Sequence, residues 1–103
     1  FRHNDFEILK EQLQQRQLKA DSPRWLFCES LYSMDGDLVA LEPMLEFAAE
    51  FGFAVYIDEA HAGGLMGKNG MGLCSGKQEI QISMGTFGKA MGSFGAYVCL
   101  PSV

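Results

Sequence analysis

The sequence predicts an α/β fold: a mostly parallel sheet with flanking helices. Two observations indicate this class. Helical and strand-like patterns alternate along the 103 residues, and the strand-like patterns are short, nearly continuous apolar runs typical of buried parallel strands. The composition, 48% hydrophobic and 20% charged, is that of a folded domain with one core.

The first half of the chain predicts a helix, a strand and a second helix. Asn4 and the glutamate three residues later have the spacing of a capping box, which predicts a helix with Asn4 as its N-cap that ends near Leu18. We expect residues 24–30 to form a strand that is buried on both faces. Apolar residues at helical spacing over 41–49 predict the second helix, which Gly52 ends.

The second half predicts three further strands separated by glycine-containing loops. Residues 53–57 read as another buried strand, and a glycine-rich loop from Gly63 to Gly72 follows. Residues 79–84 alternate apolar and polar side chains, and 96–100 form the last apolar run. Ligands of open parallel sheets bind beyond the carboxyl ends of the strands, so polar residues at those ends are candidates for a site.

Charge and cysteine usage exclude several classes of protein. The net charge of −5, with scattered basic residues, argues against a nucleic-acid partner, and no apolar stretch is long enough to span a membrane. The cysteines Cys28, Cys74 and Cys99 have no C-x-x-C spacing, which argues against zinc and disulfides. We expect reduced thiols in a cytoplasmic protein, with Cys28 and Cys99 packed in strands.

Two residues after the strand at 53–57 could share one cleft. Asp58 at a strand end needs a fixed cationic partner, which could be a metal ion, an arginine or the protonated ring nitrogen of a cofactor. A carboxylate that only braces the loop is the alternative. His61 could transfer protons or simply hydrogen-bond within its loop, and Asp58 with His61 would lack a third metal ligand.

Lys89 lies between Gly88 and Ala90, whose small size lets a bulky group approach. A buried lysine with a lowered pKa forms Schiff bases, whereas an exposed loop lysine is the alternative. Thr86 offers a hydroxyl suited to phosphate. A nucleotide-binding P-loop is excluded because Ser83 stands where that motif needs glycine, and Ala90 where it needs Ser or Thr.

Four motifs together resemble the α-oxoamine synthases, which are pyridoxal 5′-phosphate (PLP) enzymes of the aspartate-aminotransferase-like fold (fold type I). The motifs are Phe1–Asp5, Glu29–Asp37, Ile57–His61 and Gly85–Ala90. The resemblance implies that residues 1–103 are the central portion of a PLP-binding large domain in a longer chain. It gives His3 and Glu29 no role beyond structural support.

The resemblance also implies a role for each candidate residue. Lys89 would carry PLP as a Schiff base and, once released, act as the catalytic base. Asp58 would pair with the pyridine nitrogen, and His61 and Ser33 would hydrogen-bond the phenolic oxygen. His61 would assist proton transfer, and Thr86 would contact the phosphate.

The implied reaction is decarboxylative condensation of an amino acid with an acyl-CoA or acyl-carrier-protein thioester. Ala60 and Gly95-Ala96 favour the members that join L-alanine to a pimeloyl thioester in biotin biosynthesis. Members that use glycine or serine are the alternative. The chain departs from the family at Gly63-Gly64, where Thr-Gly is usual, and at Met71, where Arg is usual. The loss of that Arg removes a positive charge near the mouth of the cleft and is expected to change contacts with the acyl donor.

The resemblance further implies a homodimer whose sites form at the subunit interface. We expect residues 1–103 alone to be inactive, because the group that stacks on PLP and the arginine for the substrate carboxylate lie in other segments of such enzymes. A non-catalytic subunit that keeps the fold as a partner-binding scaffold is the alternative.

Overall fold

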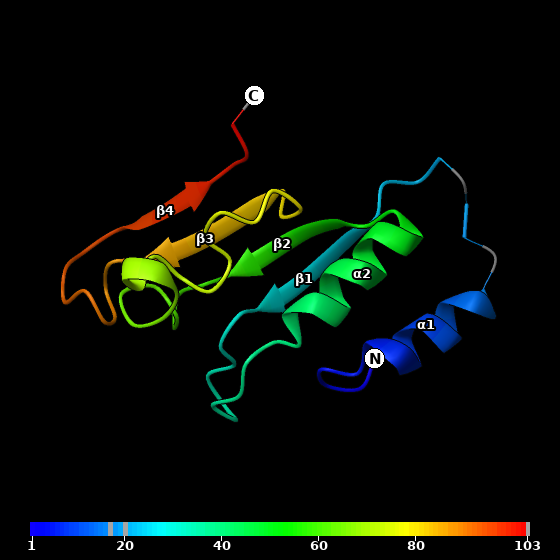
Figure 1. Ribbon diagram of the computed structural model, residues 1–103, viewed down its shortest axis with the longest axis horizontal. Coiled ribbons are helices and arrows are strands. Elements are labelled where there is room, and N and C mark those ends of the chain that lie inside the picture. The colour runs from blue at the N-terminus through cyan, green and yellow to red at the C-terminus, as the bar shows by residue number, and fades with distance from the viewer. Residues whose placement is uncertain (17, 20, 103) are drawn as a thin grey trace.

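A four-stranded sheet with the order β1-β2-β3-β4 forms the centre of the computed structural model, which describes residues 1–16, 18–19 and 21–102 (Figure 1). The strands are β1 (Trp25–Glu29), β2 (Ala54–Asp58), β3 (Ile82–Thr86) and β4 (Ala96–Cys99). β1, β2 and β3 are parallel, and β4 runs antiparallel to β3. The predicted α/β class with a mostly parallel sheet is therefore confirmed.

The strand register divides side chains between two faces of the sheet. Glu29 is paired with Asp58, and Asp58 with Met84, so these three side chains point to one face, which we call the open face. Cys28 and Ile57 are paired one residue earlier and point to the opposite face, which we call the helix face. Both of these residues are buried, so the core lies on the helix face.

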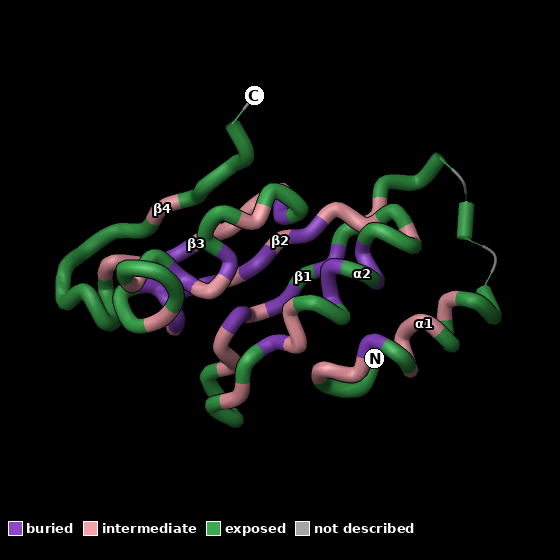
Figure 2. Tube along the Cα trace, viewed as in Figure 1, coloured by how far each residue is buried: buried purple, intermediate pink, exposed green. Residues whose placement is uncertain are grey.

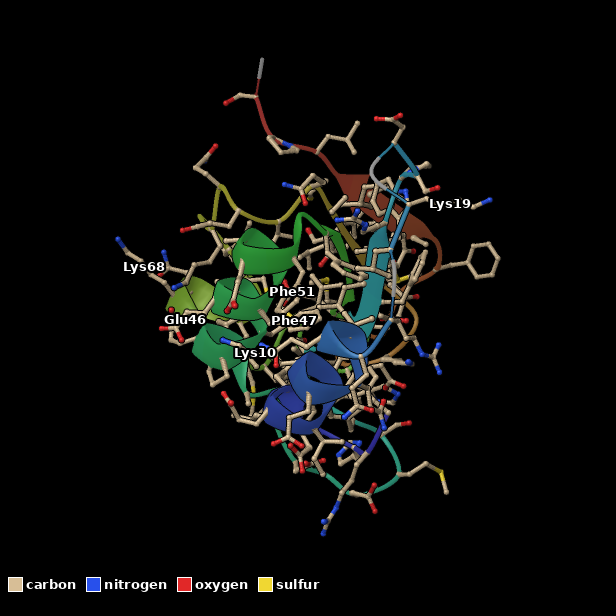
Figure 3. The ribbon with its side chains drawn as sticks, turned by 90° about the vertical axis from the view of Figure 1, so that its right-hand side faces the viewer. Lys10, Lys19, Glu46, Phe47, Phe51 and Lys68 are labelled. Atoms are coloured by element: carbon tan, nitrogen blue, oxygen red, sulfur yellow. The ribbon has the colours of Figure 1, made fainter. Side chains whose placement is uncertain are left out.

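Two helices, α1 (Phe6–Gln14) and α2 (Leu41–Phe51), cover the helix face. Figure 1 shows α2 beside β1, with α1 beyond it. Phe47 of α2 lies 6.1 Å from Phe6 and 5.0 Å from Phe51, measured between ring centroids, so phenylalanines fill the space between the helices (Figure 3). Gly52 ends α2 in the left-handed conformation, at φ 67°, as predicted.

The N-terminal cap of α1 differs from the prediction. Asp5, rather than Asn4, is the N-cap, and its carboxylate accepts a hydrogen bond from Ile8 N at 3.0 Å. The Asn4 side chain instead accepts from Ala40 N at 2.8 Å and donates to Leu38 O at 2.7 Å, so it ties the N-terminus to the segment before α2. α1 also ends at Gln14, earlier than expected; Gln17, which the predicted helix included, lies outside the described residues.

β1 is buried on one face only, so the prediction of burial on both faces is wrong. Trp25 and Phe27 are 42% and 67% exposed, because both helices lie on the helix face (Figure 2). Cys28 is buried as predicted, whereas Cys99, in β4, is exposed. β3 begins at Ile82, three residues later than predicted.

A loop that contains the short 3-10 helix η1 (Lys68–Gly70) connects β2 to β3. No helix within the described residues combines the length and the apolar character that crossing a bilayer requires.

Candidate functional site

The carboxyl ends of β1, β2 and β3 meet at one edge of the sheet. Glu29, Asp58 and Thr86 are the last residues of these strands. Glu29 and Asp58 are register partners on the open face, and Thr86, two residues beyond Met84, shares that face. The strand ends therefore place two carboxylates and a hydroxyl side by side, as the parallel fold predicted.

The Asp58 carboxylate is half-buried and accepts a hydrogen bond from Ala60 N at 2.7 Å. The ion pairs found among the described residues do not include Asp58. A half-buried carboxylate without a cation is costly, so this side chain is suited to receive a cationic group from a ligand. The loop-bracing role that the sequence left open is also present, because the bond to Ala60 N closes the turn after β2.

Lys89 and His61 come together at the same edge. The Lys89 Nζ atom lies 2.9 Å from His61 Nε2, although 28 residues separate them in the sequence. When Lys89 is an ammonium group it donates, so His61 must then be neutral with Nε2 as the acceptor. The contact links the turn after β2 to the loop between β3 and β4, and it gives the amine a partner that can accept a proton.

Lys89 is exposed in the described chain, whereas the Schiff-base prediction expects a shielded amine. The reason is the same as for Phe27: the described helices leave the open face uncovered. The position of Lys89 is nevertheless fixed, because Gly92 N donates to Lys89 O at 3.0 Å and Phe87 N donates to Gly95 O at 3.0 Å.

Thr86 braces the loop that carries Lys89. Its hydroxyl donates to Gly95 O at 3.0 Å and accepts from Gly88 N at 3.1 Å. The one hydroxyl hydrogen is thus used within the loop, and Thr86 would have to turn from Gly95 to donate to a phosphate.

Ser33 is exposed in the loop after β1, and the contacts among the described residues do not join it to Lys89 or His61. Its backbone N donates to the Glu29 carboxylate at 3.3 Å. On the far side of this loop, His3 Nε2 lies 2.9 Å from an Asp37 oxygen. Glu29 and His3 therefore both support the Ser33 loop, which fits the structural role expected of them.

The pKa of the Asp37 carboxyl lies below its usual value, chiefly because His3 hydrogen-bonds to it. His3, Asp35 and Asp37 also form the cluster of potential metal ligands found among the described residues. Asp58 and His61 are not part of it.

A cavity of about 600 Å³ lies beside β3 and β4, and Glu59, Cys74 and Tyr97 are among the residues that line it. Asp58, His61 and Lys89 do not line it, and the register places Tyr97 on the helix face. This cavity is therefore separate from the convergent polar residues, which we take as the candidate site because they lie at one edge of the sheet.

Sequence reasoning missed Glu59, which follows Asp58 directly. Glu59 is only 4% exposed, and its carboxylate accepts from Cys74 N at 3.0 Å. Burial, with the Glu59 charge as the next cause, raises the pKa of the Cys74 thiol. A signal was present in the sequence, because an acid that follows an apolar strand and alternates with Asp58 must point to the covered face.

The family to which the chain belongs follows from comparison with known proteins. All 103 residues match the family model described as aminotransferase class I and II, and the chain belongs to that family. The 8-amino-7-oxononanoate synthase of Gluconacetobacter diazotrophicus is 43% identical over 98 residues, which are 95% of this chain and 24% of the relative. The resemblance to α-oxoamine synthases is thereby confirmed.

Solved structures of serine palmitoyltransferase share the fold. A variant of the S. paucimobilis enzyme with a bound PLP–myriocin aldimine is 33% identical, with a TM-score of 0.86 over 99% of this chain and 26% of that chain. The Sphingomonas wittichii enzyme is 31% identical, with a TM-score of 0.85 over 97% of this chain and 25% of that chain. The chain spans about a quarter of the length of the curated relatives it matches.

Proposed function

We propose that this chain contributes the central part of the PLP site of an α-oxoamine synthase, a PLP-dependent acyltransferase. The observation that carries the proposal is the 2.9 Å contact between Lys89 Nζ and His61 Nε2, next to the unpaired carboxylate of Asp58. The donor set fits the cofactor, since PLP needs an amine for attachment, an anion for its protonated ring nitrogen and hydrogen-bond donors for its oxygens. The PLP bound to a serine palmitoyltransferase of the same fold supports this choice.

In this proposal Asp58 holds the ring nitrogen of PLP in its protonated form. The cofactor then serves as an electron sink for the negative charge that develops at the Cα atom of the amino-acid substrate. The requirement on the protein is an ionised, well-oriented carboxylate. The Ala60 N–H donates to Asp58 Oδ1 at 2.7 Å, which orients the side chain.

Lys89 would supply the amine that holds the cofactor, and its free amine would be the base that accepts the Cα proton of the amino-acid substrate. The His61 ring 2.9 Å away orients the Lys89 amine and would assist proton transfer. His61 and Ser33 would hydrogen-bond the phenolic oxygen of PLP, and Thr86, once its hydroxyl turns from Gly95 O, would donate to the phosphate. The rest of the chain must cover the open face to exclude water from Lys89.

For the substrates we propose L-alanine and a pimeloyl thioester, of CoA or of a carrier protein, with 8-amino-7-oxononanoate for biotin synthesis as the product. The identity of 43% to an 8-amino-7-oxononanoate synthase supports this choice. The second candidate is a serine palmitoyltransferase-type reaction. It is supported by the similarity of the fold to two serine palmitoyltransferase structures, with TM-scores of 0.86 and 0.85.

We further propose that the active form is a cytoplasmic homodimer of a longer chain, in which residues 1–103 belong to the PLP-binding large domain. Free thiols at Cys28, Cys74 and Cys99 are the ordinary state in a reducing compartment. Sedimentation of the full-length protein tests the dimer, and a monomer that binds PLP and turns over substrate would contradict it.

The test of the cofactor proposal is a PLP titration of full-length protein, followed by its absorbance. Lys89→Ala should abolish the covalent absorbance band while leaving the fold intact, and Lys68→Ala, at an exposed lysine of η1, should leave the band unchanged (Figure 3). Equal bands in the parent protein and Lys89→Ala would contradict the assignment of Lys89.

The test of the substrates is CoA release with alanine, glycine and serine against pimeloyl-CoA, succinyl-CoA, acetyl-CoA and palmitoyl-CoA. We expect selective turnover of alanine with pimeloyl-CoA. Selective use of serine with palmitoyl-CoA would establish the second candidate instead, and no CoA release with any pair by PLP-loaded protein would favour the non-catalytic scaffold.

A further inference from the structure

Glu59 is a buried acid that the proposed reaction does not use. It lies between Asp58 and His61 in the sequence, but unlike the half-buried Asp58 its side chain is 4% exposed and bonded to the backbone of Cys74, a residue of the core. A buried carboxylate is costly unless hydrogen bonds compensate for the lost water. Cys74 N donates to Glu59 Oε1 at 3.0 Å, so the carboxylate fastens the glycine-rich loop to the end of β2.

The backbone of Glu59 connects the two segments that carry the candidate site. Its N–H donates to Met84 O of β3 at 2.8 Å, and β3 leads into the Lys89 loop. Its carbonyl accepts from Ala62 N at 3.0 Å and from Gly63 N at 2.8 Å, which closes the turn that presents His61. A shift of Glu59 would therefore move the His61 turn relative to Lys89.

The glycine-rich loop packs tightly against the Glu59 carboxylate at Gly72. An added Cβ atom at Gly72 would lie 2.1 Å from Glu59 Oε2, which is well inside van der Waals contact. A Cβ atom at Gly76, four residues later, would meet nothing within 4 Å. Both glycines have positive φ, at 95° and 84°, so alanine is strained at both positions but disturbs Glu59 only at Gly72.

We infer that Glu59 is a positioning residue for the proposed PLP chemistry: its buried carboxylate, held by Cys74 N and Gly72, sets the turn that brings His61 to Lys89. This inference rests on the proposed function for its catalytic meaning. The geometric part, which is the dependence of the His61–Lys89 contact on Glu59, does not need the cofactor.

The test uses full-length protein with and without PLP. In the protein without PLP, the ring nitrogens of isotope-labelled His61 report the contact with Lys89, and the signals lost in His61→Asn identify them. We expect Gly72→Ala to move these signals toward those of Lys89→Ala, while Gly76→Ala, matched for backbone strain, leaves them in place.

The PLP dissociation constant is the second measurement. Glu59→Ala leaves Cys74 N buried without an acceptor, so we expect the constant to rise about tenfold, whereas Glu59→Gln keeps an acceptor oxygen and should stay within about threefold of the parent protein. If Glu59→Ala does not fold, the two glycine variants carry the test.

The inference is overturned if Gly72→Ala and Gly76→Ala shift the His61 signals equally. It is also overturned if Glu59→Ala folds and leaves both the His61 signals and the PLP affinity unchanged, because Glu59 would then have a merely structural role. A parent protein that does not bind PLP would instead refute the proposed function, and the His61 signals would still decide the geometric part.

Discussion

Tyr97 lies across Gly85 in the neighbouring strand, and this contact predicts a large effect of a single methyl group. Gly85 and Tyr97 are register partners in the β3–β4 ladder. An added Cβ atom at Gly85 would lie 2.3 Å from the Tyr97 hydroxyl oxygen and 2.4 Å from the ring carbon that bears it. Phe87 packs on the same ring at 5.2 Å between centroids, which restricts the room for the ring to move aside.

Gly85→Ala should therefore destabilise the protein by about 1–3 kcal/mol, the usual cost of overpacking. The assay is urea unfolding of the full-length protein, in which the loss appears as a lower midpoint. Gly88→Ala is the matched control, since a Cβ atom there would lie an ordinary 3.5 Å from Thr86 Oγ1. We expect the control to stay within about 0.5 kcal/mol of the parent protein.

A double variant distinguishes the clash with Tyr97 from a general intolerance of β3 to alanine at Gly85. In a Tyr97→Ala background the ring is gone, so Gly85→Ala should cost about 0.5 kcal/mol or less, a coupling of roughly 1–2 kcal/mol. The reasoning is refuted if Gly85→Ala is as stable as the parent protein, or if its cost is the same with and without the Tyr97 ring.

Two further predictions concern the N-terminal segment. Asp5→Ala should lower the free energy of unfolding by about 1 kcal/mol through loss of the α1 cap. Glu7→Gln, at the residue that a capping box would use, should change the free energy of unfolding by less than about 0.5 kcal/mol. Equal losses in the two variants would favour the predicted capping box over the Asp5 cap. The pKa of Asp37 is lowered by its bond to His3, so this bond stabilises the fold above the unfolded pKa of 3.8 and is lost as the pH falls through the folded pKa. Unfolding midpoints between pH 7 and pH 2 should fall less steeply for Asp37→Asn than for the parent protein, and identical slopes would contradict this.

The sequence predicted the elements well where local chemistry decides them. Gly52 ends α2 because only glycine easily adopts the left-handed conformation there. Asp58 stands at the end of β2 because the apolar run stops there, whereas β3 extends to Thr86, two residues beyond the predicted end. The N-cap of α1 could not be predicted, because Asn4 donates to Leu38 O and accepts from Ala40 N, and these tertiary hydrogen bonds compete with the capping box.

The sequence predicted that Asp58, His61 and Lys89 lie near strand ends, but it did not predict their contacts. The contact between His61 and Lys89 depends on how the β3–β4 loop turns, which the spacing of glycines does not determine. Burial was also wrongly predicted: apolar runs such as Trp25–Glu29 do not indicate whether the described helices cover one face or both. The sequence could signal the burial of Glu59 but not its contacts with Gly72 and Cys74, which are distant in the sequence.

The most direct test of the proposed cofactor site is borohydride reduction of the full-length protein loaded with PLP, followed by peptide mapping. Reduction fixes the cofactor to whichever amine holds it. The site described here predicts a single label on Lys89, in the peptide that contains Thr86 and Gly88, and loss of that label in Lys89→Ala. A label on any other lysine, or none on protein that has bound PLP, would contradict it.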